Sequence, residues 1–479
     1  MNIIGRVKNR WYEDGGYAEV LTVAIPLIIS TGMWSVQHFV DRMFLTWYSP
    51  AAIAAAMPAG MLSFTATCIF IGTASYAGTF VAQYYGSQEY DRCGPSVWQG
   101  MYIAVLGGAV LLLLIPVAGP LFSMIGHASE IQECERIYFI ILCYGGFPSI
   151  ASSALAAFYS GLGKTWPVMW VNVAVTAINL FLDWVLIFGH WGCPELGIAG
   201  AGIATVSAFF VGSMIYFFLL SRPVYARRFH TIKGWHFDRA LFVRLIRFGF
   251  PNGLHFFIEI AGFTVFILLI GRLGTTSLAA SNIAFNINTL AFMPMIGMGI
   301  AISVLVGQRL GANNPLLAER STYSAFHLAG LYMIGIAIFY VILPDLFIQP
   351  FAAQADPATF ASIRSLTIVL LRFVAVYSLF DAMNIVFASA VKGAGDTRFV
   401  MVMELVLSLF VLVVPSYITI VHYSMGIYIG WIFASAYIIT LGIAFYLRFL
   451  SGQWKAMRVI EKRITPIPSR FPAVPTGEK

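Results

Sequence analysis

A series of long apolar stretches constrains this chain more than any other feature. A helix needs roughly 20 mainly apolar residues to cross the hydrocarbon core of a bilayer. Stretches of that character lie at about residues 18–46, 52–83, 97–122, 134–161, 166–189, 196–220, 246–271, 277–308, 322–346, 361–391, 399–421 and 425–449. The sequence therefore predicts an all-α polytopic membrane protein with about twelve transmembrane helices.

Charged residues are too scarce for a soluble globular protein. They make up 10% of the 479 residues, whereas soluble domains carry about 25%. Most of the 28 Lys and Arg residues fall in segments on one side of the predicted helices. The exceptions are Arg42, Arg136, Arg272, Arg364 and Arg372. Because Lys and Arg accumulate in cytoplasmic loops, we expect a multi-pass protein of the cell membrane with both termini in the cytoplasm. Lipid accounts for its apolar surface, and nucleic acid is not an expected partner.

Identical residues recur at one constant offset between the two halves of the chain. The aligned pairs are Pro26 with Pro251, Gly72 with Gly297, Gln83 with Gln308, and Gly86 with Gly311. A second repeat, Gly-x-Gly-x-Thr, occupies residues 161–165 and 393–397. Each half contains an even number of predicted helices, so equivalent helices run in the same direction. We therefore expect two six-helix lobes related by a pseudo-two-fold axis along the membrane normal.

The expected organisation has five parts. A cytoplasmic segment at 1–17 precedes an N-lobe at 18–221, which holds helices 1–6. A basic cytoplasmic linker at 222–245 leads to a C-lobe at 246–450, which holds helices 7–12. A basic, Pro-rich cytoplasmic tail follows at 451–479. Two lobes that rock about a shared cleft suit alternating-access transport.

Two acids in the C-lobe fall near the predicted midplane. At 1.5 Å per residue from Arg247 and Lys392, Glu259 and Asp381 both lie roughly 17–18 Å deep. Ionisable groups at that depth usually serve ions or substrates. Tyr377, Asp381 and Asn384 share one helix face, and His255 lies one turn from Glu259. The alternatives are a pair of structural carboxyls and a packing role for His255.

Two further acids fall at one depth in the N-lobe. Asp41 and Asp183 are each about 9 Å from the outer ends of their helices. Asn179 and Asp183 belong to a polar stripe that begins at Asn172 and Thr176. Two carboxylates with neutral oxygens suit a small hard cation or a shared proton. The alternative is an Asp41–Arg42 pair beside a stripe that serves helix packing.

No enzyme motif accompanies these acids. The sequence contains no HExxH, GxSxG or Walker loop, and its five cysteines form no CxxC pair. We therefore expect a transporter without a cofactor, energised by an ion gradient; an intramembrane enzyme is the less favoured alternative.

Several short motifs together resemble the multidrug and toxic compound extrusion (MATE) family, in its bacterial NorM-like branch. They are VDRMF at 40–44 with AAIAA at 51–55, VAQYYG at 81–86, NLFLD at 179–183, FFIE at 256–259, VGQRLG at 306–311 and KGAGDT at 392–397. The resemblance extends from about residue 20 to 450.

The resemblance also implies roles for individual residues. Asp41, Asn179, Asp183 and Thr205 match a sodium or proton site of the N-lobe. Glu259 and Asp381 match an ion-coupling or substrate site of the C-lobe. Arg42 beside Asp41 departs from this pattern and would disturb a proton role there.

The function implied is antiport, in which small organic cations or drugs leave in exchange for inward sodium or protons. We expect the transporter to act as a monomer. The alternative is a flippase for lipid-linked saccharides of the same superfamily. A flippase of that kind would need a cationic cleft, whereas the intramembrane charge here is mainly acidic.

Overall fold

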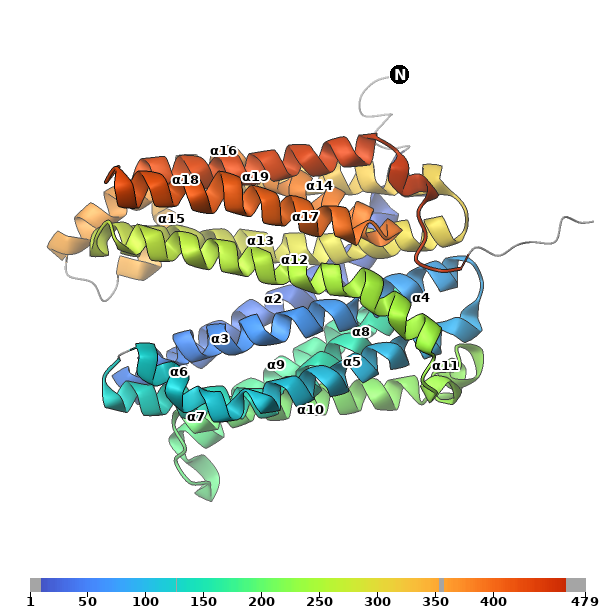
Figure 1. Cartoon of the computed structure of the whole chain (residues 1–479), viewed down its shortest axis with the longest axis horizontal. Helices are drawn as coiled ribbons and strands as arrows, with labels where there is room; N and C mark the ends of the chain where they lie inside the picture. Colours follow the sequence, from blue (N-terminus) through green and yellow to red (C-terminus); the bar gives the residue numbers. More distant parts are fainter. Residues whose placement is uncertain (1–9, 126, 353–356, 462–479) are drawn as a thin grey trace, which may run out of the picture.

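The computed structural model describes residues 10–125, 127–352 and 357–461, and within those ranges it contains helices but no strand (Figure 1). Residues 1–9 of the predicted N-terminal segment and 462–479 of the predicted tail lie outside the described residues. Eleven helices are long and apolar enough to cross a membrane, and the pair α7 (Ser129–Tyr144) and α8 (Gly146–Gly161), bent by 44°, raises that number to twelve. The predicted all-α fold is confirmed.

The first half of the chain forms one helical bundle, the N-lobe (Figure 1). Besides α7 and α8, its helices are α2 (Tyr17–Tyr48), α3 (Pro50–Ser75), α4 (Ala77–Gly86), α5 (Cys93–Leu113), α6 (Ala118–Ile125), α9 (Thr165–Phe188) and α10 (Ile198–Leu220). Within this bundle α2 packs on α9, α5 on α8, and α10 on α9.

The second half forms the C-lobe, drawn from lime to red in Figure 1. Its helices are α12 (Arg239–Gly271), α13 (Thr275–Gly311), α14 (Pro315–Ile342), α15 (Pro344–Ala352), α16 (Pro357–Ala394), α17 (Thr397–Leu407), α18 (Val414–Tyr417) and α19 (Ile427–Leu450). The π-helical segment η5 (Ser408–Val413) joins α17 to α18, a second one, η6 (Ile418–His422), follows α18, and together they form one span. Helix α16 packs against α13, α14 and α19 and so lies at the centre of this lobe.

The segment between the lobes is more helical than the sequence predicted. It contains α11 (Pro223–Arg228) and η4 (Lys233–Trp235), and α12 begins at Arg239 instead of near residue 246. The cause is a cap: the carboxylate of Asp238 accepts a hydrogen bond of 3.0 Å from the backbone N–H of Leu241. Helix α14 likewise begins early, because Asn314 caps it and Pro315 starts it.

Two aligned glycines lie where the lobes touch. Helix α2 packs against α13, and α3 packs against α12. A Cβ on Gly72 would lie 2.6 Å from the Cα of Gly253, and a Cβ on Gly297 would lie 2.6 Å from the backbone N of Ile28. Any larger side chain would separate the helices at these contacts, so the aligned pair Gly72 and Gly297 sets how closely the lobes approach.

At one end of the molecule, two glutamines close the boundary between the lobes. The side-chain amide of Gln83 in the N-lobe donates a hydrogen bond of 3.0 Å to the carbonyl of Gly393 in the C-lobe. The amide of Gln308 in the C-lobe donates one of 2.8 Å to the carbonyl of Gly161 in the N-lobe. We call these two hydrogen bonds the crossed latch. It joins the two repeats detected in the sequence, the aligned glutamines and the Gly-x-Gly-x-Thr segments.

The same end carries the start of α2, α11 and the last described residues, and we call it the terminal end (Figure 1). Residues 453–461, the C-terminal strap, run across it. The backbone N–H of Val459 donates a hydrogen bond of 2.8 Å to Oε1 of Gln83. The carboxylate of Glu461 pairs with Arg244 of the C-lobe at 2.6 Å and with Arg92 of the N-lobe at 3.6 Å. The strap therefore contacts both lobes.

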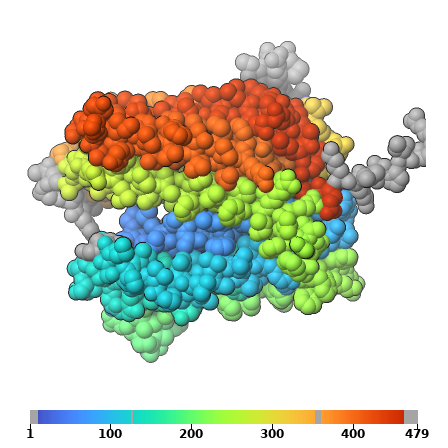
Figure 2. All heavy atoms as spheres, viewed as in Figure 1, coloured from blue at the N-terminus to red at the C-terminus, as the bar shows by residue number. Residues whose placement is uncertain are grey.

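At the opposite, open end the lobes stand apart. Figure 2 shows a hollow between the blue N-lobe helices and the lime edge of the C-lobe, whereas the terminal end is filled. The molecule is thus open at one end and closed at the other.

Candidate ion-coupling sites

The N-lobe site lies between α2, α9 and α10. Asp41 on α2 and Asp183 on α9 are both buried, and their carboxyl groups act on each other as direct neighbours. The amide of Asn179, one turn before Asp183, reaches the hydroxyl of Thr205 on α10 at 3.5 Å. The structure thus brings together all four residues that the sequence placed in this site.

Four buried oxygens of this site lack a hydrogen-bond donor among the described residues. They are Oδ1 of Asp41, Oδ1 of Asn179, and Oδ1 and Oδ2 of Asp183. Buried polar atoms are normally paired, so such a cluster of unpaired acceptors is unusual. Carboxylate, amide and hydroxyl oxygens are ligands for a hard cation, and two adjacent carboxyls can also share a proton. Among the described residues, no three His, Cys, Asp and Glu side chains are arranged so that they could hold a metal ion together.

Asp41 and its chain neighbour Arg42 lie in different surroundings. The side chain of Asp41 is buried and that of Arg42 is exposed, and no ion pair joins them among the described residues, although the Arg42 charge acts on the Asp41 carboxyl. The polar stripe on α9 also contacts α2, because Asn172 donates a hydrogen bond to the hydroxyl of Ser30.

The sequence analysis missed one residue near this site. Tyr138 on α7 interacts electrostatically with both Asp41 and Asp183. Its position in α7 carries no polar pattern that could have indicated this.

The C-lobe site is built mainly on α12 and α16. Asp381 is buried and Glu259 is half-buried, and the two carboxyl groups interact electrostatically. Asn384, one turn along α16, interacts with the carboxyl of Asp381. Tyr377 is buried one turn before Asp381, and its hydroxyl has no hydrogen-bond partner among the described residues. The predicted face of α16 is therefore formed.

A third acid, Glu404 on α17, lies next to this site, beyond His255. Its side chain is buried inside the lobe, although it lies only six residues after Arg398. Nε2 of His255 lies 3.5 Å from Oε2 of Glu404, and the hydroxyl of Tyr437 on α19 donates a hydrogen bond to Oε1. The sequence signal that could have found it is an acid inside the apolar stretch 399–421. Depth alone could not reveal that the side chain points away from the lipid headgroups.

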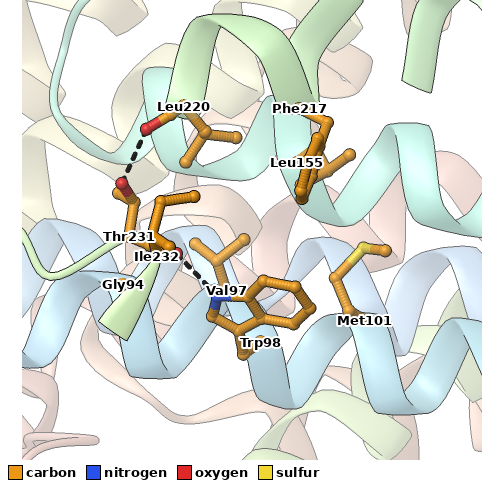
Figure 3. A pocket seen from close by; sticks show the side chains of 9 residues that line it. All are labelled: Gly94, Val97, Trp98, Met101, Leu155, Phe217, Leu220, Thr231 and Ile232. Carbon is orange, nitrogen blue, oxygen red and sulfur yellow. Dashed lines mark hydrogen bonds between the residues drawn. The ribbon is translucent and has the colours of Figure 1, made fainter. Parts of the chain in front are cut away.

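Two cavities outside these sites differ in character. A cavity of about 10 Å³ between α5, α8, α10 and the inter-lobe segment has apolar walls and is too small for a drug (Figure 3). It lies where Trp98 donates a hydrogen bond of 2.7 Å to the carbonyl of Thr231, which fixes that segment on α5. A cavity of about 420 Å³ opens at the open end of the N-lobe, and its walls include Tyr48, Glu130 and Glu195.

Known proteins match this chain over most of its length. The model of the MatE family matches residues 26–185 and 251–418. The multidrug resistance protein PmpM of Pseudomonas aeruginosa is 30% identical over 395 residues, which cover 81% of this chain and 80% of that protein. The probable multidrug resistance protein NorM of Thermotoga maritima is 24% identical over 451 residues, covering 93% and 94%.

Solved structures give the same result for the fold. An outward-facing multidrug resistance MATE family transporter of the MOP superfamily superposes with a TM-score of 0.84 at 18% identity, over 94% of this chain and 98% of that one. The matched family, relatives and structures are transporters, so the expectation of a transporter instead of an enzyme is confirmed. The two matched segments of the family model together span well over half of the chain, and the chain therefore belongs to the MatE family, in its NorM-like branch.

Proposed function

We propose that this protein is a secondary antiporter that exports small organic cations in exchange for protons or sodium ions. The observation that carries the proposal is a buried, acidic group in each lobe of a molecule that is open at only one end. Carboxylates placed in a low-dielectric interior favour a cation at that point, whether this is the coupling ion or the cargo. The names of the relatives, multidrug resistance proteins, support the same class of cargo.

The proposed orientation places the terminal end in the cytoplasm. Most Lys and Arg residues lie there, and the positive-inside rule favours that arrangement. The structure then represents an outward-facing state, with the crossed latch closing the cytoplasmic side. Rocking of the lobes would break the latch and expose both acidic groups to the cytoplasm. Export results because a coupling ion and the cargo bind the two states with different affinity.

The N-lobe residues Asp41, Asn179, Asp183 and Thr205 would hold the coupling ion, sodium or a proton. The C-lobe residues Glu259 and Asp381 would bind cargo or a proton, with Tyr377, Asn384 and His255 beside them. Glu130 and Glu195 at the mouth of the N-lobe would raise the local concentration of cations at the open end. Both sites are complete within one chain, which supports a monomeric transporter in the cell membrane.

The test uses the full chain in proteoliposomes loaded with a fluorescent organic cation. A sodium gradient and a pH gradient are imposed separately, and the release or accumulation of the dye is followed. We expect one of the gradients to drive transport, and a protein with Glu259→Gln to lose it. Movement of a lipid-linked saccharide without movement of the dye would favour the flippase instead.

A further inference from the structure

His255, Glu404 and Tyr437 form a polar group inside the C-lobe, of which the proposed antiport cycle has given a place only to His255. His255 is 7% exposed, and Glu404 and Tyr437 are each 1% exposed. The three side chains come from α12, α17 and α19, so the group lies within the lobe and not on the cleft surface alone. A buried carboxylate is costly unless its partners compensate, which makes an acid at this place informative.

The bonding pattern of His255 differs from that of a packing histidine. A buried imidazole that only fills space normally has both ring nitrogens hydrogen-bonded. Here Nε2 lies 3.5 Å from Oε2 of Glu404, whereas Nδ1 has no partner among the described residues. One nitrogen is thus free to accept a proton while the other faces a carboxylate that can take one. A histidine held in this way can pass a proton between two neighbours.

The ionisable groups descend in order from the midplane towards the terminal end. Counting about 1.5 Å per residue from Arg247, Glu259 lies roughly 18 Å deep and His255 roughly 12 Å. Counted from the start of α17, Glu404 lies roughly 10 Å deep. Glu259 and His255 are one helical turn apart, with Cβ atoms about 6 Å from each other, a gap that one water molecule can bridge.

We propose that His255 and Glu404 form a proton-holding station, which receives the coupling proton from Glu259 and releases it when the terminal end opens. The proposal rests on the proposed function, in its proton-coupled form. The Glu259 carboxyl gives its proton to Nδ1 of His255, and the imidazolium gives the proton on Nε2 to Oε2 of Glu404. The number of protons is unchanged: Glu259 becomes a carboxylate and Glu404 a carboxylic acid. Tyr437 is a positioning residue, because its hydrogen bond to Oε1 holds the carboxyl so that Oε2 faces the imidazole.

The burial of Glu404 explains why such a station would not leak. Its side chain is closed off in this state, while the crossed latch and the strap close the boundary between the lobes. A proton that reaches Glu404 therefore waits until the lobes part. The charged and titratable side chains that surround the Glu404 carboxyl group belong to three helices. They are His255 and Glu259 on α12, Lys392 and Asp381 on α16, and Tyr437 on α19.

The first test separates proton movement from cargo movement in proteoliposomes. Exchange of labelled for unlabelled organic cation needs no net proton transfer, whereas accumulation of the cation driven by a pH gradient does. We expect Glu404→Gln to leave exchange within about twofold of the unmodified protein and to lower gradient-driven accumulation at least tenfold. Glu404→Asp should restore most of the accumulation. Glu319→Gln is the matched control, because that acid pairs with Lys455 on the surface of the C-lobe.

The second test needs no cargo and keeps the proposal falsifiable if the organic cations chosen are not transported. Infrared difference spectra of the full chain, recorded after a pH jump, report protonation of buried carboxyl groups. A carboxylic-acid band should disappear in Glu404→Gln, shift in His255→Gln, and stay unchanged in Glu319→Gln.

Three outcomes would overturn the station. The first is undiminished gradient-driven accumulation in both Glu404→Gln and His255→Gln. The second is a Glu404→Gln protein that loses exchange and accumulation equally and melts at a lower temperature, while Glu404→Asp restores neither activity. That result would make Glu404 a structural acid. The third is the absence of any band assigned to Glu404 between about pH 5 and 9. Failure of the unmodified protein to exchange any organic cation would instead contradict the proposed function, and the infrared result would still decide the station.

Discussion

Asp41 and Asp183, from helices more than a hundred residues apart in the chain, place two carboxyl groups side by side in the interior of the N-lobe. Three of their four oxygens lack a hydrogen-bond donor among the described residues. Two such acids cannot both stay charged without a counter-charge, so a bound cation or a shared proton would stabilise this pair.

Asp41→Asn should remove the response of the N-lobe to the coupling ion. In the unmodified protein, we expect sodium or low pH to change the reaction rate of a cysteine placed at Phe39, a side chain that is 68% exposed. The amide cannot release a proton and lacks the charge that attracts sodium, so the rate should no longer change. Asp91→Asn, on an exposed acid of the terminal end, is the control. If the reaction rate of the Asp41→Asn protein still changes with sodium or pH, Asp41 and Asp183 have a structural role.

Glu259→Gln and Asp381→Asn should each lower efflux of an organic cation at least tenfold without lowering expression. Both changes keep the shape of the side chain and remove the charge that binds a cation or carries a proton. Efflux from cells or vesicles measures the effect. Glu133→Gln serves as the control, because its exposed pair with Arg136 contributes little to stability. Normal efflux by both variants would show that these two acids are structural.

Gln83→Ala and Gln308→Ala should move the protein away from the state in which the terminal end is closed. Gln308→Ala removes one hydrogen bond across the lobe boundary, worth roughly 1 kcal/mol or about a fivefold shift, and Gln83→Ala removes two, to Gly393 and from Val459. Spin labels at positions 133 and 275, one in each lobe at the open end, should then report a larger population with a short separation. The double variant should shift further than either single one. Gln132→Ala, far from the boundary, should leave the distances unchanged. If all variants give the same distances, the crossed latch does not contribute to closure of the terminal end.

Truncation of the C-terminal strap should weaken closure of the terminal end more than neutralisation of Glu461, the acid in the strap. Glu461 is about half exposed, so Glu461→Gln should shift the same label distances by no more than about a fivefold change in population. Truncation after Met457 also removes the backbone hydrogen bond from Val459 to Gln83 and should shift them further. If truncation has no effect on the distances, the strap does not hold the lobes together.

Cysteine labelling checks the proposed orientation. After replacement of the five native cysteines, a cysteine at Lys233 should react with an impermeant reagent only when the cytoplasmic side is exposed. A cysteine at Glu133 should react from outside in intact cells. Reaction of position 233 in intact cells would invert the topology.

Sequence periodicity predicted much of this molecule because a membrane leaves few alternatives. Apolar length alone located the spans, and most boundaries moved by only a few residues. The larger shifts, at Arg239 and Pro315, came from caps formed by Asp238 and Asn314. Caps extend a helix into polar sequence, where apolar length gives no signal.

Helical spacing also placed Asp41 and Asp183 at one depth, but depth does not specify which way a side chain points. Glu404 illustrates the limit, because its partners His255 and Tyr437 come from two other helices. Tyr138 was missed for the same reason, since only the packing of α7 brings it near the N-lobe acids. Contacts between helices that are distant in the chain have no local pattern in the sequence.

The crossed latch is also symmetric. Gln83 of one half binds Gly393 of the other, and Gln308 binds Gly161, so each half supplies one donor and one acceptor at equivalent positions. Reciprocal pairing of this kind is what an isologous interface between two identical subunits produces. The closed boundary therefore has the symmetry of a contact between two identical six-helix subunits, although one chain forms it. Each half carries one donor and one acceptor, so neither half closes the boundary by itself.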